Sequence, residues 1–289
     1  MSRTENPNDW PPGVLYIVAT PIGNLEDITL RALKVLGRVD IVAAEDTRRT
    51  GVLLKTYGIK KPLMSCFAHN EEKQSRRIIE ILKEGQTVAL VSDAGMPGIS
   101  DPGARLVSQA LDAGISLTVV PGPSAGLTAL AASGLDTEAF AFCGFFPRET
   151  KAKKAWLLRF GSFTGTLVFY ESPRRLLATL RGLGEAWGDR YCCVARELTK
   201  RYEEFIRGSL AEVAEELGKA DAIKGEIVVV LEGYRGKGKE AVTPEEAEEM
   251  GRNLIAGGMG VKEASLQIAQ QTGMTAKACY ALLINRESP

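Results

Sequence analysis

Four loops hold the residues of this sequence whose types and spacing best suit chemistry. Each loop follows a short apolar run and combines glycine or proline with small or acidic side chains. The loops are 20–25, 45–49, 92–103 and 121–125. Glycine and proline fix the turn shapes and let a backbone approach a ligand closely. Ordinary turns would explain any one of these loops, but four together favour a ligand-binding site.

The preceding apolar runs, 14–20, 41–44, 87–91 and 117–120, predict the strands that position these loops. Their nearly continuous apolar character is typical of strands buried on both faces of a parallel sheet. Apolar residues at helical spacing lie between them, and Gly37, Gly85 and Gly114 follow where helix C-caps are expected. This alternation predicts an α/β domain over 14–136. Ligands bind beyond the carboxyl ends of such strands, so the four loops should converge on one crevice.

The pattern changes after this point. Strands are expected at 139–144, 166–170, 191–197, 203–207 and 226–231, with a helix over 173–187. The short gap between the third and fourth of these strands requires an antiparallel pair, and the whole predicts a mixed α/β domain over 137–234. A basic Gly-Lys linker at 235–239 leads to helices over 240–289, whose spacing is that of a helix-turn-helix or of a plain helical appendage. The polar segment 1–13 is expected to be a disordered tail.

Composition excludes several classes of protein. The 36 Lys and Arg residues balance 36 Asp and Glu, so any nucleic-acid contact must come from a local patch. The single histidine, His69, and five cysteines without a CxxC pair predict no metal site and no disulfide framework. Gly233–Lys239 resembles a phosphate loop but has Glu240 where a Ser or Thr belongs. No apolar run could span a bilayer, which predicts a soluble, cytoplasmic protein.

The loops also carry a family resemblance. TPIGNLEDIT (20–29), AAEDTR (43–48), VSDAGMPGISDPG (91–103) and VVPGPSA (119–125) resemble the tetrapyrrole methylase superfamily of S-adenosylmethionine-dependent methyltransferases. The segments at 141–148, 169–175 and 195–200 extend the resemblance, which covers about 14–234. The first and third loops depart from the GxGxGD and GGDP patterns of corrin and porphyrin enzymes. These departures favour the branch that methylates ribosomal RNA.

The resemblance implies a two-domain α/β protein, usually a homodimer, that binds S-adenosylmethionine between its domains and needs no metal. The implied acceptor is the ribose 2′-oxygen of a cytidine in the decoding region of 16S rRNA, presented by free rRNA or by the small ribosomal subunit. A tetrapyrrole-like small molecule as acceptor, or a non-catalytic role in ribosome assembly, remains the alternative. The implied donor contacts are Pro21, Asp93, Ala94, Gly95, Ile99, Ser124, Ala125, Tyr170, Leu198 and Thr199.

Transfer to a ribose hydroxyl requires a group that accepts its proton. Glu45, Asp46 and Lys200 are the candidate catalytic residues, followed by Asp93, Glu197 and His69. Structural roles compete with these: Asp46 could cap a helix beginning at Thr47, and Glu197 could pair with Arg196 or Arg201. The candidate phosphate contacts are the local basic clusters Arg48–Arg49, Arg148 with Lys151, Lys153 and Lys154, Arg174–Arg175, and Lys200–Arg201. Solvated surface is the alternative for each cluster.

Overall fold

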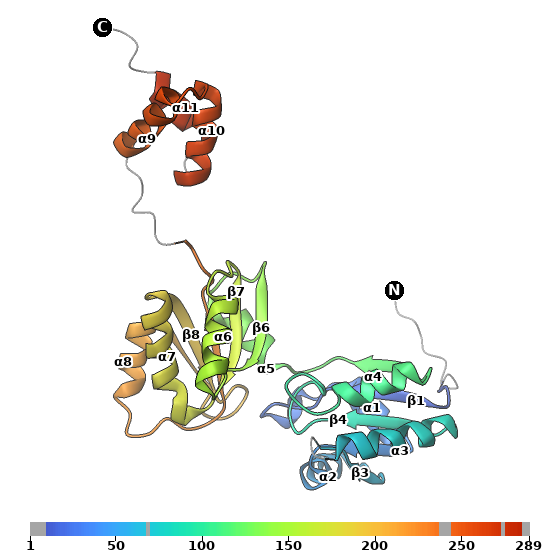
Figure 1. The fold of residues 1–289 in the computed structure, drawn as a ribbon. Helices are drawn as coiled ribbons and strands as arrows, with labels where there is room; N and C mark the ends of the chain where they lie inside the picture. The colour runs from blue at the N-terminus through green and yellow to red at the C-terminus, as the bar shows by residue number, and fades with distance from the viewer. Residues whose placement is uncertain (1–9, 68–69, 237–243, 273–274, 285–289) are drawn as a thin grey trace. The chain divides into compact units, whose positions relative to one another are not determined.

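The computed structural model describes residues 10–67, 70–236, 244–272 and 275–284. The chain divides into two compact units, Met1–Gly233 and Tyr234–Pro289 (Figure 1). The first unit contains two five-stranded sheets, which agrees with the expected α/β class. The predicted boundaries at 13, 136, 234 and 240 stay predictions. Residues 1–9 and 237–243 lie outside the described part of the chain.

The first sheet is parallel throughout. Its strands are β1 (Val14–Val18), β2 (Ile41–Ala44), β3 (Leu63–Ser65), β4 (Val88–Val91) and β5 (Ser116–Val120), in the order β3-β2-β4-β1-β5. The sequence did not predict β3, whose three residues are too few to give a pattern. The expectation of burial on both faces is wrong for β5. This strand lies at the sheet edge, and Val119 is 50% exposed.

Helices cover both faces of this sheet. They are α1 (Leu30–Arg38), α2 (Thr47–Thr56), α3 (Glu71–Lys83) and α4 (Ala104–Asp112), and a 3₁₀ turn, η1 (Leu25–Asp27), precedes α1. One apolar cluster joins α1 and α2 to the sheet, and a second joins α3 and α4 to the opposite face. Gly85 and Gly114 adopt positive φ after their helices, as predicted. Gly37 does not end its helix, because α1 continues to Arg38.

The strand order creates a switch point between β2 and β4, because the connection from β2 leads to β3 on one side and the connection from β4 leads to β5 on the other. β4 also neighbours β1, and the loops that follow β1 and β4 are joined directly, because Thr20 and Gly95 exchange two backbone hydrogen bonds of 2.9 and 3.0 Å. Ligands bind at such switch points in open α/β sheets.

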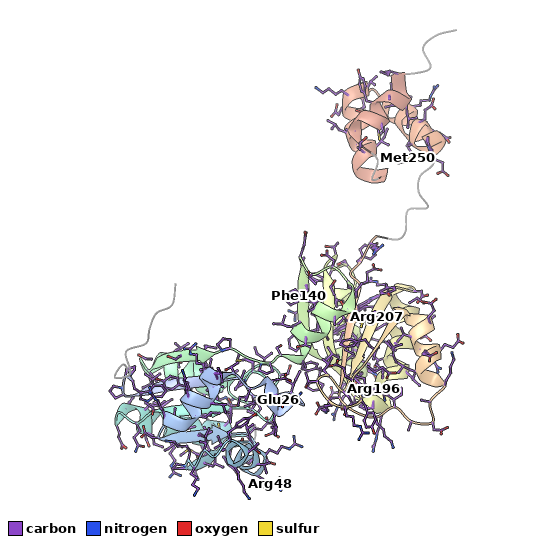
Figure 2. The ribbon with its side chains drawn as sticks, turned by 180° about the vertical axis from the view of Figure 1, so that it is seen from behind. Glu26, Arg48, Phe140, Arg196, Arg207 and Met250 are labelled. Atoms are coloured by element: carbon purple, nitrogen blue, oxygen red, sulfur yellow. The ribbon has the colours of Figure 1, made fainter. Side chains whose placement is uncertain are left out.

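The second sheet is mixed. Its strands are β6 (Phe140–Phe145), β7 (Thr166–Glu171), β8 (Tyr191–Arg196), β9 (Glu204–Ser209) and β10 (Ile227–Leu231), in the order β6-β7-β10-β8-β9. β6 and β7 are parallel and the other pairs are antiparallel, including the β8–β9 pair that the sequence predicted. Arg196 on β8 and Arg207 on β9 mark this part of the sheet in Figure 2.

Helices also cover both faces of the second sheet. α6 (Thr150–Phe160), α7 (Pro173–Trp187) and α8 (Leu210–Gly218) pack on one face around Phe169 and Leu180. Only α7 was predicted, and its bounds match. α5 (Ala125–Ser133) packs on the other face. It follows the fourth loop of the first sheet, so one helix connects the proposed ligand loops to the second sheet.

The second unit contains α9 (Pro244–Ala256), α10 (Val261–Thr272) and α11 (Ala276–Ile284). Ala247, Ile268 and Cys279 form its small core. The backbone N–H of Ala278 donates to the Thr275 hydroxyl at 3.2 Å, so Thr275 caps α11 as predicted. In the described ranges no helix is long and apolar enough to cross a membrane. Those ranges also hold no metal-ligating group of three or more His, Cys, Asp or Glu residues.

Candidate active site

A cavity of about 340 Å³ lies where the loops of the first sheet meet the second sheet. Loops after β1, β4 and β5 supply one wall, and residues near β7, β8 and β10 supply the other. Its volume is in the range of small-molecule sites. The lining comprises Ile22, Ala94, Gly95, Met96, Ile99, Asp101, Ser124, Ala125, Phe145, Tyr170, Glu171, Ser172, Pro173, Leu198, Gly225, Glu226, Ile227 and Val228.

Most of the residues predicted to contact the methyl donor line this cavity. They are Ala94, Gly95, Ile99, Ser124, Ala125, Tyr170 and Leu198. Pro21, Asp93 and Thr199 are not part of the lining, and a donor contact from them stays a prediction. The Asp93 carboxylate is occupied by the second loop, since it accepts from Asp46 N at 3.1 Å and lies 3.2 Å from Arg49 Nη1.

The first loop packs tightly against the loop after β8. A Cβ added at Gly23 would lie 2.8 Å from Thr199 Oγ1 and 2.8 Å from Leu198 O. No side chain fits there, so the glycine permits the close approach of these two loops.

Backbone strain also marks the loop after β8. Glu197 and Thr199 have φ values of 52° and 64°, in the left-handed region that ordinary residues rarely adopt. Between them the Leu198 side chain is only 5% exposed and faces the cavity. Hydrogen bonds stabilise this backbone conformation. In one of them, Glu226 N donates to Glu197 Oε1 at 2.9 Å. Such strain is concentrated at functional sites.

The three candidate catalytic residues lie beside the cavity but do not line it. Asp46 caps α2, and hydrogen bonds from the Arg48 side chain and backbone lower the pKa of Asp46 to about 2. Although burial opposes its charge, hydrogen bonds to Glu197 and Glu226 raise the pKa of Lys200. Glu45 accepts weakly from Asp93 N at 3.3 Å, and burial raises its pKa. Their catalytic roles stay predictions, although a strongly acidic Asp46 and a protonated Lys200 are poor proton acceptors.

Glu197, another candidate base, forms an ion pair. The sequence left Arg196 or Arg201 open as its partner, but the structure pairs it with Lys200, whose Nζ lies 2.9 Å from Glu197 Oε1. Arg196 pairs instead with Glu204 across the β8–β9 ladder. His69 lies outside the described residues.

Asp101 is the functional candidate that sequence reasoning missed. It lines the cavity, and burial raises its pKa to about 6, with the nearby Glu45 and Asp93 charges adding to the shift and a hydrogen bond from Ser92 opposing it. A carboxylate with a pKa close to physiological pH suits general base catalysis. The sequence shows Asp101 as an acidic residue of the third loop, but Ser100-Asp101-Pro102 is also a common turn sequence.

The lining suits a cationic ligand. It contains Asp101, Glu171 and Glu226 but no Lys or Arg. Glu171 is paired with Arg175 at 2.5 Å and accepts from Thr179 at 2.6 Å, and Glu226 lies 3.1 Å from Lys200 Nζ. Among the lining carboxylates Asp101 therefore contributes the negative charge that no ion pair of the described residues balances. Ser124 and Ala125 form the N-terminus of α5, where the Ser124 side chain makes no capping bond. Backbone N–H groups at such a helix end favour a ligand carboxylate.

Comparison with known proteins identifies the family. The tetrapyrrole (corrin/porphyrin) methylase family matches residues 14–214. The chain belongs to this family. Its curated relatives include ribosomal RNA small subunit methyltransferase I of Bacillus subtilis (strain 168), 46% identical over 93% of each chain. The protein of the same name from Thermotoga maritima is 52% identical over 76% of this chain and 99% of its own.

Solved structures agree with the tetrapyrrole methylase fold. Uroporphyrin-III-C-methyltransferase from Thermus thermophilus matches 75% of this chain and 94% of its own, with a TM-score of 0.51 and 25% identity. A diphthine synthase matches 76% of this chain and 90% of its own, with a TM-score of 0.60 and 18% identity. Both matches leave out about a quarter of this chain, a share close to that of the C-terminal unit.

Proposed function

We propose that this protein is an S-adenosylmethionine-dependent methyltransferase whose acceptor is small-subunit ribosomal RNA. The curated relatives named for that activity, at 42–52% identity over three quarters or more of the chain, carry the proposal. The cavity supports it, because its volume and acidic lining fit a sulfonium ligand. At the finer level, we propose the ribose 2′-oxygen of a cytidine in the decoding region of 16S rRNA as the methylated atom.

Different cavity residues would bind different parts of the methyl donor. The N-terminus of α5 at Ser124 and Ala125 would hold the donor carboxylate, and Ala94 and Gly95 leave room because their side chains are small or absent. Bound S-adenosylmethionine supplies an electrophilic methyl group on a positively charged sulfur. The enclosing loops would hold the acceptor in line with it, and such positioning can supply most of the rate enhancement.

Asp101 then accounts for the acceptor proton. As the ribose 2′-oxygen bonds to the methyl carbon, the carbon–sulfur bond breaks and its electrons neutralise the sulfonium. The hydroxyl proton passes to the Asp101 carboxylate, which leaves S-adenosylhomocysteine, a methylated ribose and a protonated Asp101. Of the other two cavity carboxylates, Glu171 is already held by Arg175, Thr179 and Ser172 N, and Glu226 by Lys200. Asp101 is therefore the better proton acceptor.

The basic clusters differ in their freedom to bind phosphate. Arg48 and Arg49 are paired with Asp46 and Asp93. Arg175 donates to the carbonyls of Phe146 and Pro147 and is structural. Arg148, Lys151 and Lys154, at the start of α6, are exposed and take part in none of the ion pairs found among the described residues. This group, which we call the α6 cluster, is the best candidate for the RNA backbone.

Reversing the charge of the α6 cluster is expected to weaken RNA binding without affecting donor binding. Arg148→Glu, Lys151→Glu and Lys154→Glu together remove a few phosphate contacts. The slope of log affinity against log salt concentration should therefore become shallower by about one for each phosphate that the variant no longer binds. The matched control reverses Lys34, Lys83 and Arg181, which are exposed on α1, α3 and α7. The affinity of each variant for RNA is measured over a fourfold range of salt concentration. If RNA binding is weakened equally in both variants, the α6 cluster has no specific role in it.

We also propose that the protein acts as a homodimer in the cytoplasm. Exposed apolar side chains on β5, α5 and β6, namely Val119, Leu127 and Phe142, support an interface between two copies. A ribosomal substrate supports the cytoplasmic location. Sedimentation equilibrium would give the mass of the assembly.

Methyl transfer to defined acceptors tests the proposed function. Purified protein and S-adenosylmethionine labelled on the methyl group are incubated with small subunits or free 16S rRNA from a strain lacking the gene, and the modified nucleotide is mapped. We expect label in the decoding region at a ribose. Label in a tetrapyrrole and not in RNA would favour a small-molecule enzyme. Absence of donor binding by calorimetry would favour a non-catalytic assembly factor.

Truncation after Arg235 is expected to leave donor binding intact, because every cavity residue lies in the first unit. The Thermotoga maritima relative supports this, since it is covered almost completely by 76% of this chain. Calorimetry should give the same affinity for the truncated and full-length proteins. A folded truncated protein that does not bind S-adenosylmethionine would contradict the site. If the truncated protein binds RNA or small subunits more weakly, α9, α10 and α11 help to dock the substrate. If its binding is unchanged, these helices only pack together.

A further inference from the structure

An irregularity in β6 turns an aromatic side chain into the mouth of the cavity. Along β6, Phe142 pairs with Val168 and Phe145 pairs with Tyr170, so the strand holds one extra residue between these positions. Gly144, in this bulge, has a φ of 65°. In an unbroken strand, Phe145 would share the face of Ala141 and Cys143, which pack against the α6 and α7 core. The bulge places Phe145 on the face of Phe142 instead.

The Phe145 ring is held in place yet remains open to solvent. Its centroid lies 5.2 Å from that of Tyr170 in an edge-to-face arrangement, and Tyr170 contacts Phe142 in the same way at 5.1 Å. Phe145 is nevertheless 60% exposed, and it lines the cavity together with Asp101. Bulges are often found next to active sites, where they redirect a side chain. An exposed aromatic ring that also lines a site is available to contact what the site binds.

The backbone around this ring is also fixed. Phe146 N donates to Tyr170 O at 2.9 Å, and the Arg175 guanidinium donates to the carbonyls of Phe146 and Pro147. Arg148 follows directly and opens the α6 cluster. The chain thus presents an exposed aromatic ring next to free positive charge, the combination by which proteins bind unpaired nucleotides.

We propose that Phe145 is the platform on which the target nucleobase of the RNA stacks. The inference rests on the proposed function and deepens it. A base turned out of its helix stacks on aromatic side chains, and its sugar is thereby placed for chemistry. Stacking on Phe145 would hold the attached ribose near Asp101 at the cavity, while the α6 cluster contacts the neighbouring phosphates. Phe145 is thus a positioning contact for the acceptor and plays no part in donor binding.

Phe145→Ala tests this proposal through the separation of acceptor and donor binding. Loss of one stacked base typically weakens nucleic-acid binding by about tenfold to a hundredfold, so we expect the KM for the RNA acceptor to rise by that factor. The affinity for S-adenosylmethionine should be unchanged. Phe145→Trp should retain acceptor binding, whereas Phe145→Leu, which is apolar but not aromatic, should behave like the alanine variant.

Phe140→Ala is the matched control. Phe140, labelled in Figure 2, lies on the same strand and is 40% exposed. It is not among the residues that line the cavity. Its acceptor KM should remain that of the unmodified protein. A fall in donor affinity for Phe145→Ala would overturn the inference, because the ring would then contact the donor. An unchanged acceptor KM would also overturn it. Failure of the unmodified protein to methylate RNA would instead refute the proposed function.

Discussion

Asp101→Asn is expected to lower kcat for methyl transfer by about 10²- to 10⁴-fold, the usual contribution of a general base. Asparagine keeps the size and polarity of the side chain but cannot accept the ribose proton. The affinity for S-adenosylmethionine should fall far less than kcat, since the apolar walls and the N-terminus of α5 are unchanged. Single-turnover methylation of small subunits, with calorimetry of donor binding, separates the two effects. A kcat equal to that of the unmodified protein would exclude Asp101 as the base.

The pH dependence of the rate gives a second readout for Asp101. Burial raises its pKa to about 6 from an ordinary 3.8, so the basic form is lost as the pH falls through about 6. The rate of the unmodified enzyme should decrease tenfold per pH unit below that value. Asp101→Asn should lack this acid limb. Glu45→Gln should keep the acid limb but move it to lower pH, because the Glu45 charge helps to raise the pKa of Asp101.

Asp101→Asn should also stabilise the fold at neutral pH. Because its pKa is raised by folding, Asp101 binds more protons in the folded chain than in the unfolded chain between about pH 4 and 6. The free energy of unfolding therefore falls as the pH rises through this window, and the cost is complete above it. Asp101→Asn removes that cost, so its advantage in Tm should be small at pH 4 and grow up to pH 7. A more stable but inactive variant is typical of a functional carboxylate.

Ser124→Arg is expected to weaken S-adenosylmethionine binding at least tenfold, which corresponds to about 1.4 kcal/mol. The larger side chain would fill part of the cavity and place a positive charge beside the sulfonium. Ala131→Arg is the matched control, because it adds the same side chain to an exposed position of the same helix. Calorimetry of both variants, with circular dichroism to confirm folding, measures the effect. Equal affinity in Ser124→Arg and the unmodified protein would place the donor elsewhere.

The local pattern of the sequence was enough to predict most elements and their class. Continuous apolar runs marked β1, β2 and β4, and Pro173 and Trp187 bounded α7 as expected. These signals are local, since they depend on side-chain periodicity and on turn residues. The strand β3, which has only three residues, and the helices α6 and α8 were not predicted. The strand β5 was predicted, but its expected burial on both faces was wrong because it lies at the sheet edge. The family resemblance, which is also a property of sequence alone, was confirmed by the family match.

The roles of individual site residues were decided only by tertiary structure. Sequence spacing placed Asp46, Asp93 and Asp101 in adjoining loops, but it gave no measure of which carboxylates find partners. Folding pairs Asp93 with Arg49 of the second loop, and leaves Asp101 partly buried in the cavity lining. The direction of Phe145 likewise depends on one extra residue in a strand pairing between β6 and β7. Burial, ion pairing and register join residues that are distant in sequence, so periodicity and motifs could not determine them.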